Sequence, residues 1–248
     1  MKLNGKSAIV TGGASGFGAG IVRRFVREGA RVLIADLNGD GAAALADELG
    51  DHAIGLEVDV CSTADVENMV ASARQFAGGV DILVNNAGIG HAPVAMESLP
   101  EETFDRILDV NVKSIYRTAR QVVPLMKAAG AGAILNMAST GGVSPRPNLT
   151  WYNASKGWVI TATRAMAIEL AADGVRVNAL NPVAGETPLL KTFMGEDSPE
   201  VRAKFLASIP IGRFSTPDDM GAAASFLCSD DASMITGVAL EVDGGRCI

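Results

Sequence analysis

The chain has 248 residues, of which 48% are hydrophobic and 20% charged, a composition typical of a folded globular protein. The 28 acidic residues outnumber the 21 Lys and Arg residues, and the net charge of −7 argues against nucleic-acid or anionic-membrane partners. The three Cys are widely spaced, and with only two His they predict neither disulfides nor a metal site. The sequence has no signal-peptide pattern and no apolar run approaching the roughly 18 residues of a membrane span. We therefore expect a cytoplasmic protein.

Short apolar runs alternate along the chain with longer stretches of helical periodicity. The expected strands are residues 7–11, 31–36, 53–58, 81–85, 133–138, 175–180 and 238–242. The expected helices are residues 18–28, 42–49, 63–76, 101–129, 151–172 and 218–228. Pro124 lies inside the fourth of these helices and is expected to kink or break it. The alternation predicts a parallel sheet covered by helices on both faces.

The whole chain, residues 1–248, is expected to form one Rossmann-type, doubly wound α/β domain with about seven parallel strands. Its length allows one or two domains on the usual scale of roughly 150 residues each, but no stretch of low complexity interrupts the alternation. Residues 183–215 are richer in Pro, Gly and charge than the rest. We expect them to form a long excursion that serves as a lid or substrate-binding segment.

A glycine-rich turn follows the first expected strand. Glycine lets the backbone turn tightly and approach a ligand, and the next helix offers unpaired N–H groups and partial positive charge to a pyrophosphate. The spacing is T-G-x-x-x-G-x-G and not the commoner G-x-G-x-x-G, so an ordinary flexible turn remains the alternative. The turn consists of Thr11, Gly12, Gly13, Ala14, Ser15, Gly16, Phe17 and Gly18.

Asp36 ends the second expected strand. A carboxylate at this position can accept hydrogen bonds from an adenosine ribose, and it repels the 2′-phosphate of NADP. The next residue, Leu37, supplies no basic side chain to offset that repulsion. Together with the glycine turn, Asp36 favours NAD over NADP, with a merely solvated strand-end aspartate as the alternative.

Tyr152 and Lys156 are four residues apart at the start of an expected helix, which puts both side chains on one helical face. A phenol with an ordinary pKa near 10 is a poor base at neutral pH. A neighbouring ammonium favours the phenolate and lowers that pKa, which makes proton transfer with an alcohol feasible. Taken alone, such a pair is more often an ordinary surface pair.

Two further polar residues favour a functional role for the Tyr152–Lys156 pair. Ser139 lies just past the fifth expected strand, at the carboxyl edge where open α/β sheets bind ligands, although such a serine is usually a turn or cap residue. Its hydroxyl could hold a carbonyl oxygen that Tyr152 protonates. Asn111 lies in the middle of an expected helix, where Asn is not favoured. It is either simply exposed, or it holds a water molecule against Lys156.

In this order, these motifs resemble the short-chain dehydrogenase/reductase family over essentially the whole chain. The resemblance implies hydride transfer between NAD and an alcohol or carbonyl substrate, such as a sugar, a polyol or an aryl alcohol or aldehyde. The matching residues are Thr11, Gly12, Gly16, Phe17, Gly18, Asp36, Asp59, Val60, Asn85, Asn86, Ala87, Gly88, Asn111, Ser139, Tyr152, Lys156, Asn181, Pro182, Thr187 and the Asp243-Gly244-Gly245 run.

The resemblance also implies a role for each site residue. Tyr152 would be the general acid/base, Lys156 would lower its pKa and bind the nicotinamide ribose, and Ser139 would orient the substrate oxygen. Asn111 would complete a proton relay through water. Contacts to the cofactor are implied for Gly12, Ser15, Gly16, Phe17, Gly18, Asp36, Asp59 and Val60 beside the adenine, Asn86, Ala87, Gly88, Tyr152, Lys156, Pro182, and Thr187 at the carboxamide.

One stretch departs from the family pattern. Members usually carry Pro-Gly after the sixth strand, whereas here the run is Pro182-Val183-Ala184-Gly185-Glu186-Thr187, so the glycine has moved. Cofactor contacts by residues 183–186 are therefore left open. Three runs, at residues 149–152, 185–188 and 242–246, look like a branch of the family that includes an aromatic aldehyde dehydrogenase acting on 4-formylbenzenesulfonate.

The substrate pocket is expected to lie beside the catalytic residues. Arg146 could pair with an anionic substrate group or simply face solvent, and an indole beside the phenol of Tyr152 would suit an apolar or ring-shaped substrate. The candidates are His91, Val94, Met96, Thr140, Gly141, Arg146 and Trp151, with Leu189, Leu190, Phe193 and Met194 as an apolar lid over them.

Two other functions remain open. One is an NADPH-linked 3-oxoacyl carrier-protein reductase, for which an acidic carrier would want a basic docking patch. The other is a non-catalytic dinucleotide sensor on the same fold. For assembly, the expected helix 151–172 carries more apolar residues than one buried face needs, which predicts helix packing between subunits and a homotetramer.

Overall fold

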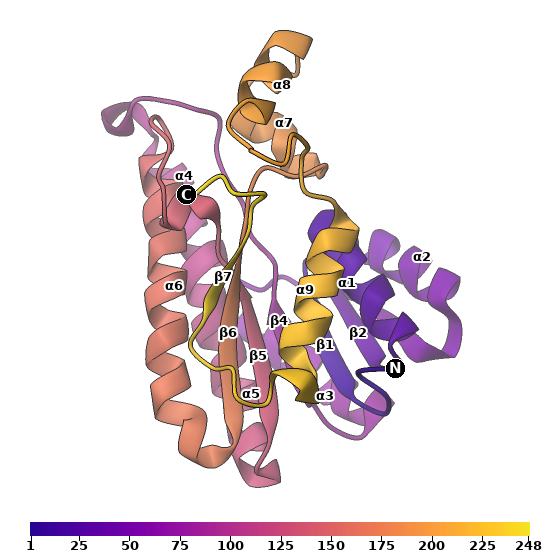
Figure 1. Ribbon diagram of the computed structural model, residues 1–248. Coiled ribbons are helices and arrows are strands. Elements are labelled where there is room, and N and C mark those ends of the chain that lie inside the picture. Colours follow the sequence, from indigo (N-terminus) through magenta and orange to yellow (C-terminus); the bar gives the residue numbers. More distant parts are fainter.

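The computed structural model describes residues 1–248 and contains one seven-stranded sheet in the order β3-β2-β1-β4-β5-β6-β7 (Figure 1). Every neighbouring pair of strands is parallel. The strands are β1 Ser7–Thr11, β2 Arg31–Asp36, β3 Ala53–Glu57, β4 Ile82–Asn85, β5 Gly132–Met137, β6 Val175–Pro182 and β7 Ala239–Val242. This is the doubly wound α/β fold expected from the sequence, which is confirmed.

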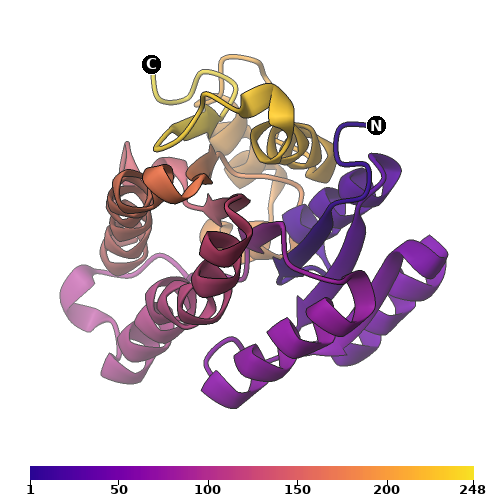
Figure 2. The same cartoon turned by 90° about the horizontal axis from the view of Figure 1, so that it is seen from below.

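Helices cover both faces of the sheet (Figure 2). The helices are α1 Gly16–Arg27, α2 Gly39–Leu49, α3 Thr63–Ala77, α4 Glu101–Leu108, α5 Ser114–Ala129, α6 Thr150–Leu170, α7 Pro188–Met194, α8 Pro199–Leu206 and α9 Pro217–Cys228. Short 3-10 turns occupy Gly50–His52, Met96–Ser98, Thr140–Gly142, Ala171–Asp173 and Asp230–Ala232. None of the helices combines the length and apolarity needed to cross a lipid bilayer.

Two hydrophobic cores, one on each face, hold the helices on the sheet. On one face α1, α2 and α9 pack against alternate strand residues such as Val10 and Ile34. On the other face α3, α5 and α6 pack against the intervening residues, such as Ile9 and Leu33. Because both faces are buried, the inner strands are apolar at consecutive positions, which explains their continuous hydrophobic runs.

The break in the expected helix 101–129 lies elsewhere than predicted. Helix α5 continues through Pro124 to Ala129, so the expected break at this proline is wrong. The interruption is instead a π-helical turn at Asp109–Lys113, between α4 and α5. Such turns insert one extra residue into the helical ladder and often occur at functional sites. Asn111 lies in the middle of this one.

The carboxyl ends of the strands form the edge where a ligand site is expected. The strand order reverses between β1 and β4, and open α/β sheets bind ligands in the crevice at this switch point. Residues 183–215, which we call the lid, follow β6 and project beyond this edge (Figure 1). The lid contains two short helices, α7 and α8, and a small apolar core of Val183, Leu190, Met194, Ile209 and Phe214.

Candidate active site

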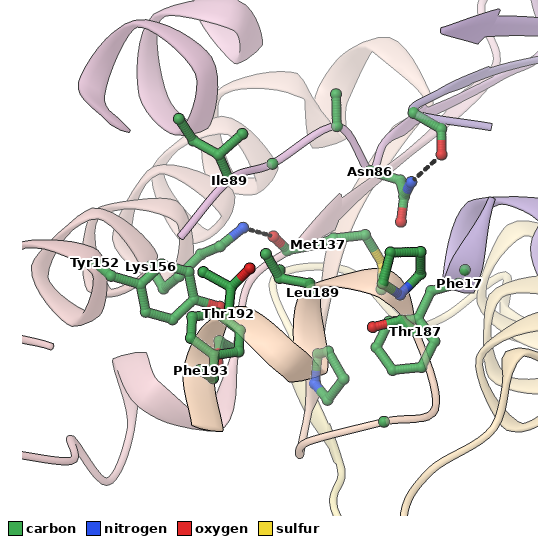
Figure 3. A pocket seen from close by; sticks show the side chains of 18 of the residues that line it. Phe17, Asn86, Ile89, Met137, Tyr152, Lys156, Thr187, Leu189, Thr192 and Phe193 are labelled. Carbon is green, nitrogen blue, oxygen red and sulfur yellow. Dashed lines mark hydrogen bonds between the residues drawn. The ribbon is translucent and has the colours of Figure 1, made fainter. Parts of the chain in front are cut away.

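A cavity of about 530 Å³ lies at the carboxyl edge of the sheet, and 37 residues line it. Every residue that the sequence predicted as a cofactor contact is among them. We call the part lined by Gly12, residues 15–18, 36–37, 58–60 and 86–89, Arg106 and Thr187 the glycine half. The lid half is the part lined by Ser139, Thr140, Gly141, Arg146, Leu149, Tyr152, Asn153, Lys156, Leu189, Leu190, Thr192, Phe193 and Phe205. Figure 3 shows Phe17, Asn86 and Thr187 on one side of the cavity, and Tyr152, Thr192 and Phe193 on the other.

Only glycine fits at key points of the β1–α1 turn. Gly12 has a φ of +61°, and a Cβ there would lie 2.9 Å from the Cα of Ala87. A Cβ on Gly18 would lie 2.0 Å from the carbonyl oxygen of Gly12. Helix α1 begins at Gly16, within this turn, and the side chain of its N-cap residue Ser15 caps none of its N–H groups. The first residues of α1 line the cavity, and their uncapped N–H groups are available as donors for a pyrophosphate.

Hydrogen bonds fix the turn to the loop after β4. The backbone N–H groups of Asn86 and Ala87 both donate to the Thr11 hydroxyl, each at 3.1 Å. The side-chain amide of Asn86 donates to the carbonyl oxygens of Thr11 at 2.9 Å and Gly12 at 2.8 Å. Residues from two strands 75 positions apart thus form one rigid wall of the glycine half.

Asp36 closes the glycine half at the end of β2. One carboxylate oxygen accepts the N–H of Ala14 at 3.0 Å and the other accepts the N–H of Asn38 at 3.0 Å. These bonds hold the carboxylate against the glycine turn, at the position where an adenosine ribose would lie. Asp59 and Val60, which follow β3, line the same region.

The displaced glycine of the 182–187 run has a structural role. A Cβ on Gly185 would lie 2.3 Å from the ring of Phe17, so the ring packs directly against the backbone there. Val183, Ala184 and Gly185 line the cavity, whereas Glu186 does not. Thr187 reaches the glycine turn, since a Cβ on Gly16 would lie 3.2 Å from its side chain. Because Gly185 has no side chain, the loop after β6 can pack against Phe17 of the glycine half.

Tyr152, Lys156 and Ser139 meet in the lid half, and each is less than a tenth exposed. Tyr152 and Lys156 come from the first turns of α6, and Ser139 precedes the 3-10 turn after β5, where its hydroxyl accepts the N–H of Gly141 at 3.0 Å. The Lys156 Nζ donates to the carbonyl oxygen of Met137 at 2.7 Å, as Figure 3 shows.

Burial has the largest effect on the protonation states of Tyr152 and Lys156. It raises the pKa of Tyr152 to about 12, while hydrogen bonding with Ser139 acts in the opposite direction. Burial also lowers the pKa of Lys156 to about 8. The expected lowering of the tyrosine pKa by Lys156 is not present, because the ammonium bonds to Met137 and the apolar surroundings disfavour both charged forms. Tyr152 is therefore a protonated phenol at neutral pH.

Asn111 does not line the cavity. It is buried, so of the two alternatives that the sequence left open, a simply exposed residue is wrong. Its amide donates to the Ile89 carbonyl oxygen at 2.9 Å and to the Ser155 hydroxyl at 3.1 Å, and its Oδ1 accepts the Ile89 N–H at 2.9 Å. A Cβ on Gly88 would lie 3.4 Å from this Oδ1 and 3.3 Å from the Lys156 Nζ. In this structure Asn111 holds the loop after β4 beside Lys156.

The substrate candidates divide into two groups. Tyr152 packs against Phe193 of the lid with ring centroids 4.8 Å apart. Candidates that line the cavity are Thr140, Gly141, Arg146, Leu189, Leu190 and Phe193. Candidates that do not line it are His91, Val94, Met96, Trp151 and Met194.

The candidates outside the cavity are held elsewhere. His91 is buried, with its Nδ1 2.8 Å from the Ala92 carbonyl oxygen. The Trp151 indole donates to the Met96 carbonyl oxygen at 3.0 Å and packs edge-on against Phe104, so it does not lie beside the phenol of Tyr152 as expected. Met194 is part of the apolar core of the lid.

Sequence reasoning missed four residues that line the lid half. Leu149 and Asn153 flank Tyr152 on the chain, and their proximity to it was an available signal. Thr192 and Phe205 come from α7 and α8, and no local pattern shows that these short helices fold back over the cavity. The missed residues are Leu149, Asn153, Thr192 and Phe205.

The cavity suits a dinucleotide and not a metal ion. Its glycine half offers a cradle that a Cβ would fill, helix N–H donors and a ribose-facing carboxylate. Its lid half brings a phenol, an ammonium and a hydroxyl into the same cavity. No group of three or more His, Cys, Asp or Glu side chains comes together in the structure to hold a metal.

Comparisons with known proteins agree with this geometry. A family model described as Enoyl-(Acyl carrier protein) reductase matches residues 12–246. The 4-formylbenzenesulfonate dehydrogenase of Comamonas testosteroni is 50% identical, covering 100% of each chain. The 2-dehydro-3-deoxy-L-rhamnonate dehydrogenase (NAD(+)) of a Sphingomonas species is 37% identical, covering 98% of this chain and 95% of the other. A crystal structure of 3-ketoacyl-(acyl-carrier-protein) reductase from Brucella melitensis complexed with NADH is 54% identical with a TM-score of 0.94, covering 99% of this chain and 100% of that one.

Proposed function

The chain belongs to the short-chain dehydrogenase/reductase family, and from that premise we propose that it is an NAD-dependent dehydrogenase with Tyr152 as its general acid/base. Membership makes it an oxidoreductase of small alcohols and aldehydes that uses a nicotinamide dinucleotide. The observation that supports the proposal best is the meeting of Tyr152, Ser139 and Lys156 in the same cavity as the glycine turn and Asp36.

The residues of the lid half supply the proton chemistry. When bound, the nicotinamide takes up or gives the hydride, which carries two electrons from or to the substrate carbon. In the oxidative direction the alcohol proton passes to the Tyr152 oxygen while the C–H bond breaks, and a carbonyl is formed. In the reductive direction the Tyr152 phenol donates its proton to the carbonyl oxygen. The Ser139 hydroxyl holds that oxygen in place, and the Lys156 ammonium, held by the Met137 carbonyl oxygen, would bind the nicotinamide ribose.

Preference for NAD is supported by Asp36. Its two oxygens are fixed by the N–H groups of Ala14 and Asn38, so the carboxylate cannot turn away from a ribose 2′-substituent. A 2′-phosphate there would face a like charge with no basic side chain at Leu37 to offset it. Two of the relatives carry NAD(+) or NADH in their names.

An aryl or sugar-like carbinol or carbonyl compound is the substrate class that we propose. The relatives act, by their names, on 4-formylbenzenesulfonate and 2-dehydro-3-deoxy-L-rhamnonate. The walls of the lid half favour the aryl compounds, because the ring of Phe193 lies against Tyr152 and leucines line the space beside it. Flat apolar walls bind a flat ring better than a hydrated polyol.

A second candidate function is reduction of a 3-oxoacyl carrier protein. It is favoured by the 54% identity to the Brucella melitensis reductase. An acidic carrier protein would need a basic surface near the cavity, and the net charge of −7 gives no sign of one. A non-catalytic sensor is less well supported, because the site retains its Tyr, Lys and Ser.

A short substrate screen tests these functions. NAD⁺ and NADP⁺ are each paired with benzylic alcohols and polyols, and NADH and NADPH with 3-oxoacyl thioesters, following absorbance at 340 nm. The proposal expects the highest kcat/KM with NAD⁺ and a benzylic alcohol. A clear preference for oxoacyl thioesters would support the second candidate, and turnover with none of the substrates would contradict an enzymatic function.

We also propose a homotetramer built partly on the outer face of α6. Ile168 is 84% exposed and Trp158 41% exposed on this helix, which is more apolar surface than a solvent-facing helix usually carries. Light scattering after gel filtration at micromolar concentration should give four times the chain mass of 25.6 kDa. A monomer would contradict the proposal.

A further inference from the structure

Arg146 is a charged residue of the lid half that the proposed reaction does not use. It lies between the 3-10 turn Thr140–Gly142 and α6, and it lines the cavity. Its guanidinium stacks on the ring of Phe205, 4.3 Å from the ring centroid, and Nη2 donates to the Ser208 hydroxyl at 3.2 Å. Its carbonyl oxygen accepts the side-chain amide of Asn153, the neighbour of Tyr152, at 2.8 Å. Contacts to the lid and to α6 thus hold Arg146 in place.

No carboxylate of the chain neutralises this guanidinium. None of the ion pairs in the structure includes Arg146. Burial, and after it the nearby cation Arg246, lowers the pKa of Arg146. Asp243 is near Arg246 in sequence, but its oxygens accept the N–H groups of Gly245 at 2.9 Å and Cys247 at 2.8 Å.

The acidic side chains of the cavity all lie in one of its halves. Its two carboxylates, Asp36 and Asp59, belong to the glycine half, where Arg106 lies beside Cys61. The lid half contains Lys156 and Arg146 and no acidic side chain. A substrate that enters the lid half therefore meets positive charge with no internal counterion, in a protein with a net charge of −7.

We propose that Arg146 binds an anionic group of the substrate, a carboxylate or a sulfonate, and so selects negatively charged aryl carbinols and aldehydes. The inference rests on the proposed function, because it places the reacting carbon at Tyr152 and the anion at the far end of the molecule. The apolar body between them lies against Phe193 and Leu189. The planar guanidinium fork suits both anions through paired N–H···O hydrogen bonds.

Matched substrates test the charge directly. The probe is 4-(hydroxymethyl)benzoate, and its control is 4-(hydroxymethyl)benzamide, which has the same shape without the charge. The wild type should oxidise the benzoate with a kcat/KM at least about 10-fold higher. R146Q should lose about 10- to 100-fold on the benzoate and less than about 3-fold on the amide. R146K keeps the charge without the fork and should fall between the two enzymes.

A binding measurement separates this inference from the proposed function. Titration calorimetry with 4-methylbenzoate, which cannot be oxidised at a carbinol, should show weaker binding to R146Q than to wild type, with and without NADH. R74Q is the matched control, because Arg74 is exposed on α3, makes no ion pair and lies outside the cavity. It should behave as the wild type in both assays.

The outcomes are distinct. Arg146-dependent binding of 4-methylbenzoate without turnover of any alcohol would contradict the proposed function and support the anion site. Equal turnover of benzoate and amide by the wild type would overturn the anion site whatever the variants do. An equal loss on both substrates in R146Q would also overturn it, since that pattern indicates a structural role.

Discussion

The two halves of the cavity are built from different parts of the chain. The glycine half is made largely of backbone, held by hydrogen bonds among Thr11, Gly12 and Asn86. The lid half is made of side chains, contributed by α6, α7 and α8. Where backbone segments pack directly against each other, only glycine or another small residue fits. Where side chains form the wall, each substitution changes the shape of the wall. The halves therefore differ in what a mutation does to them, and the following predictions test that difference.

The largest effect is expected at Tyr152 in the lid half. Tyr152→Phe removes the proton donor and acceptor and keeps the ring against Phe193, so kcat should fall by about 10² to 10⁴-fold. NADH affinity, measured by fluorescence titration, should change little. Tyr116→Phe is the control, since Tyr116 is exposed on α5 and should leave kcat unchanged. Retained activity in Tyr152→Phe would exclude the proposed acid/base role.

The second-largest effect is expected from a substitution at Gly12, in the backbone wall of the glycine half. Gly12→Ala places a methyl group 2.9 Å from the Ala87 Cα at a φ of +61°, so the wall must shift. NADH affinity should fall by at least about 10-fold, and the melting temperature should drop. Gly50→Ala has a similar φ of +68° with nothing within 4 Å, so it should cost about 1 kcal/mol of stability and no NADH affinity. Equal NADH affinity in the two variants would contradict a close-packed backbone wall.

The pH dependence tests the buried phenol. Oxidation requires the phenolate, and burial raises the pKa of Tyr152 to about 12, so the phenolate fraction increases tenfold per pH unit throughout the neutral range. The kcat/KM for oxidation should rise with this slope from pH 6 to 8. Above about pH 8 the rise in kcat/KM should become shallower, because Lys156, whose pKa is lowered to about 8, loses its proton there. Reduction uses the phenol and should stay level from pH 6 to 8. Oxidation that is level over the same range would contradict this protonation state.

Asp36 tests specificity in the glycine half. Asp36→Ala removes the like charge that faces a 2′-phosphate, so the ratio of kcat/KM for NAD⁺ over NADP⁺ should fall by about 10-fold. Asp36→Asn removes the charge and keeps the size of the side chain, so it shows whether the preference for NAD⁺ depends on the charge or on the shape of residue 36. A wild type that already prefers NADPH would show that the interpretation of Asp36 is wrong.

The halves also differ in how far the sequence predicted them. The glycine spacing and Asp36 placed the glycine half, because these residue types are required by local backbone geometry next to a strand. The seven strands were predicted near their observed positions for a similar reason, since burial on both faces leaves continuous apolar runs.

The errors lie where tertiary packing overrides local pattern. Pro124 does not break α5, and the extra residue of the π-turn at Asn111 leaves no mark in the hydrophobic period. Trp151 precedes Tyr152 in sequence, but the helix turns its indole toward Phe104 and away from the phenol. The pKa of Tyr152 depends on burial by the lid, which spacing from Lys156 alone does not reveal.

The two ends of the lid meet at one place. Gly185 and Ser215 form an isolated parallel bridge, and the Ser215 hydroxyl donates to the Val183 carbonyl oxygen at 3.3 Å. The chain between them is thus a closed loop attached to the sheet through a narrow neck. The entropy of closing such a loop grows slowly, by about 0.6 kcal/mol for each doubling of length. Insertions and deletions beyond this neck would therefore leave the sheet intact, so this one segment can change in length independently of the rest of the fold.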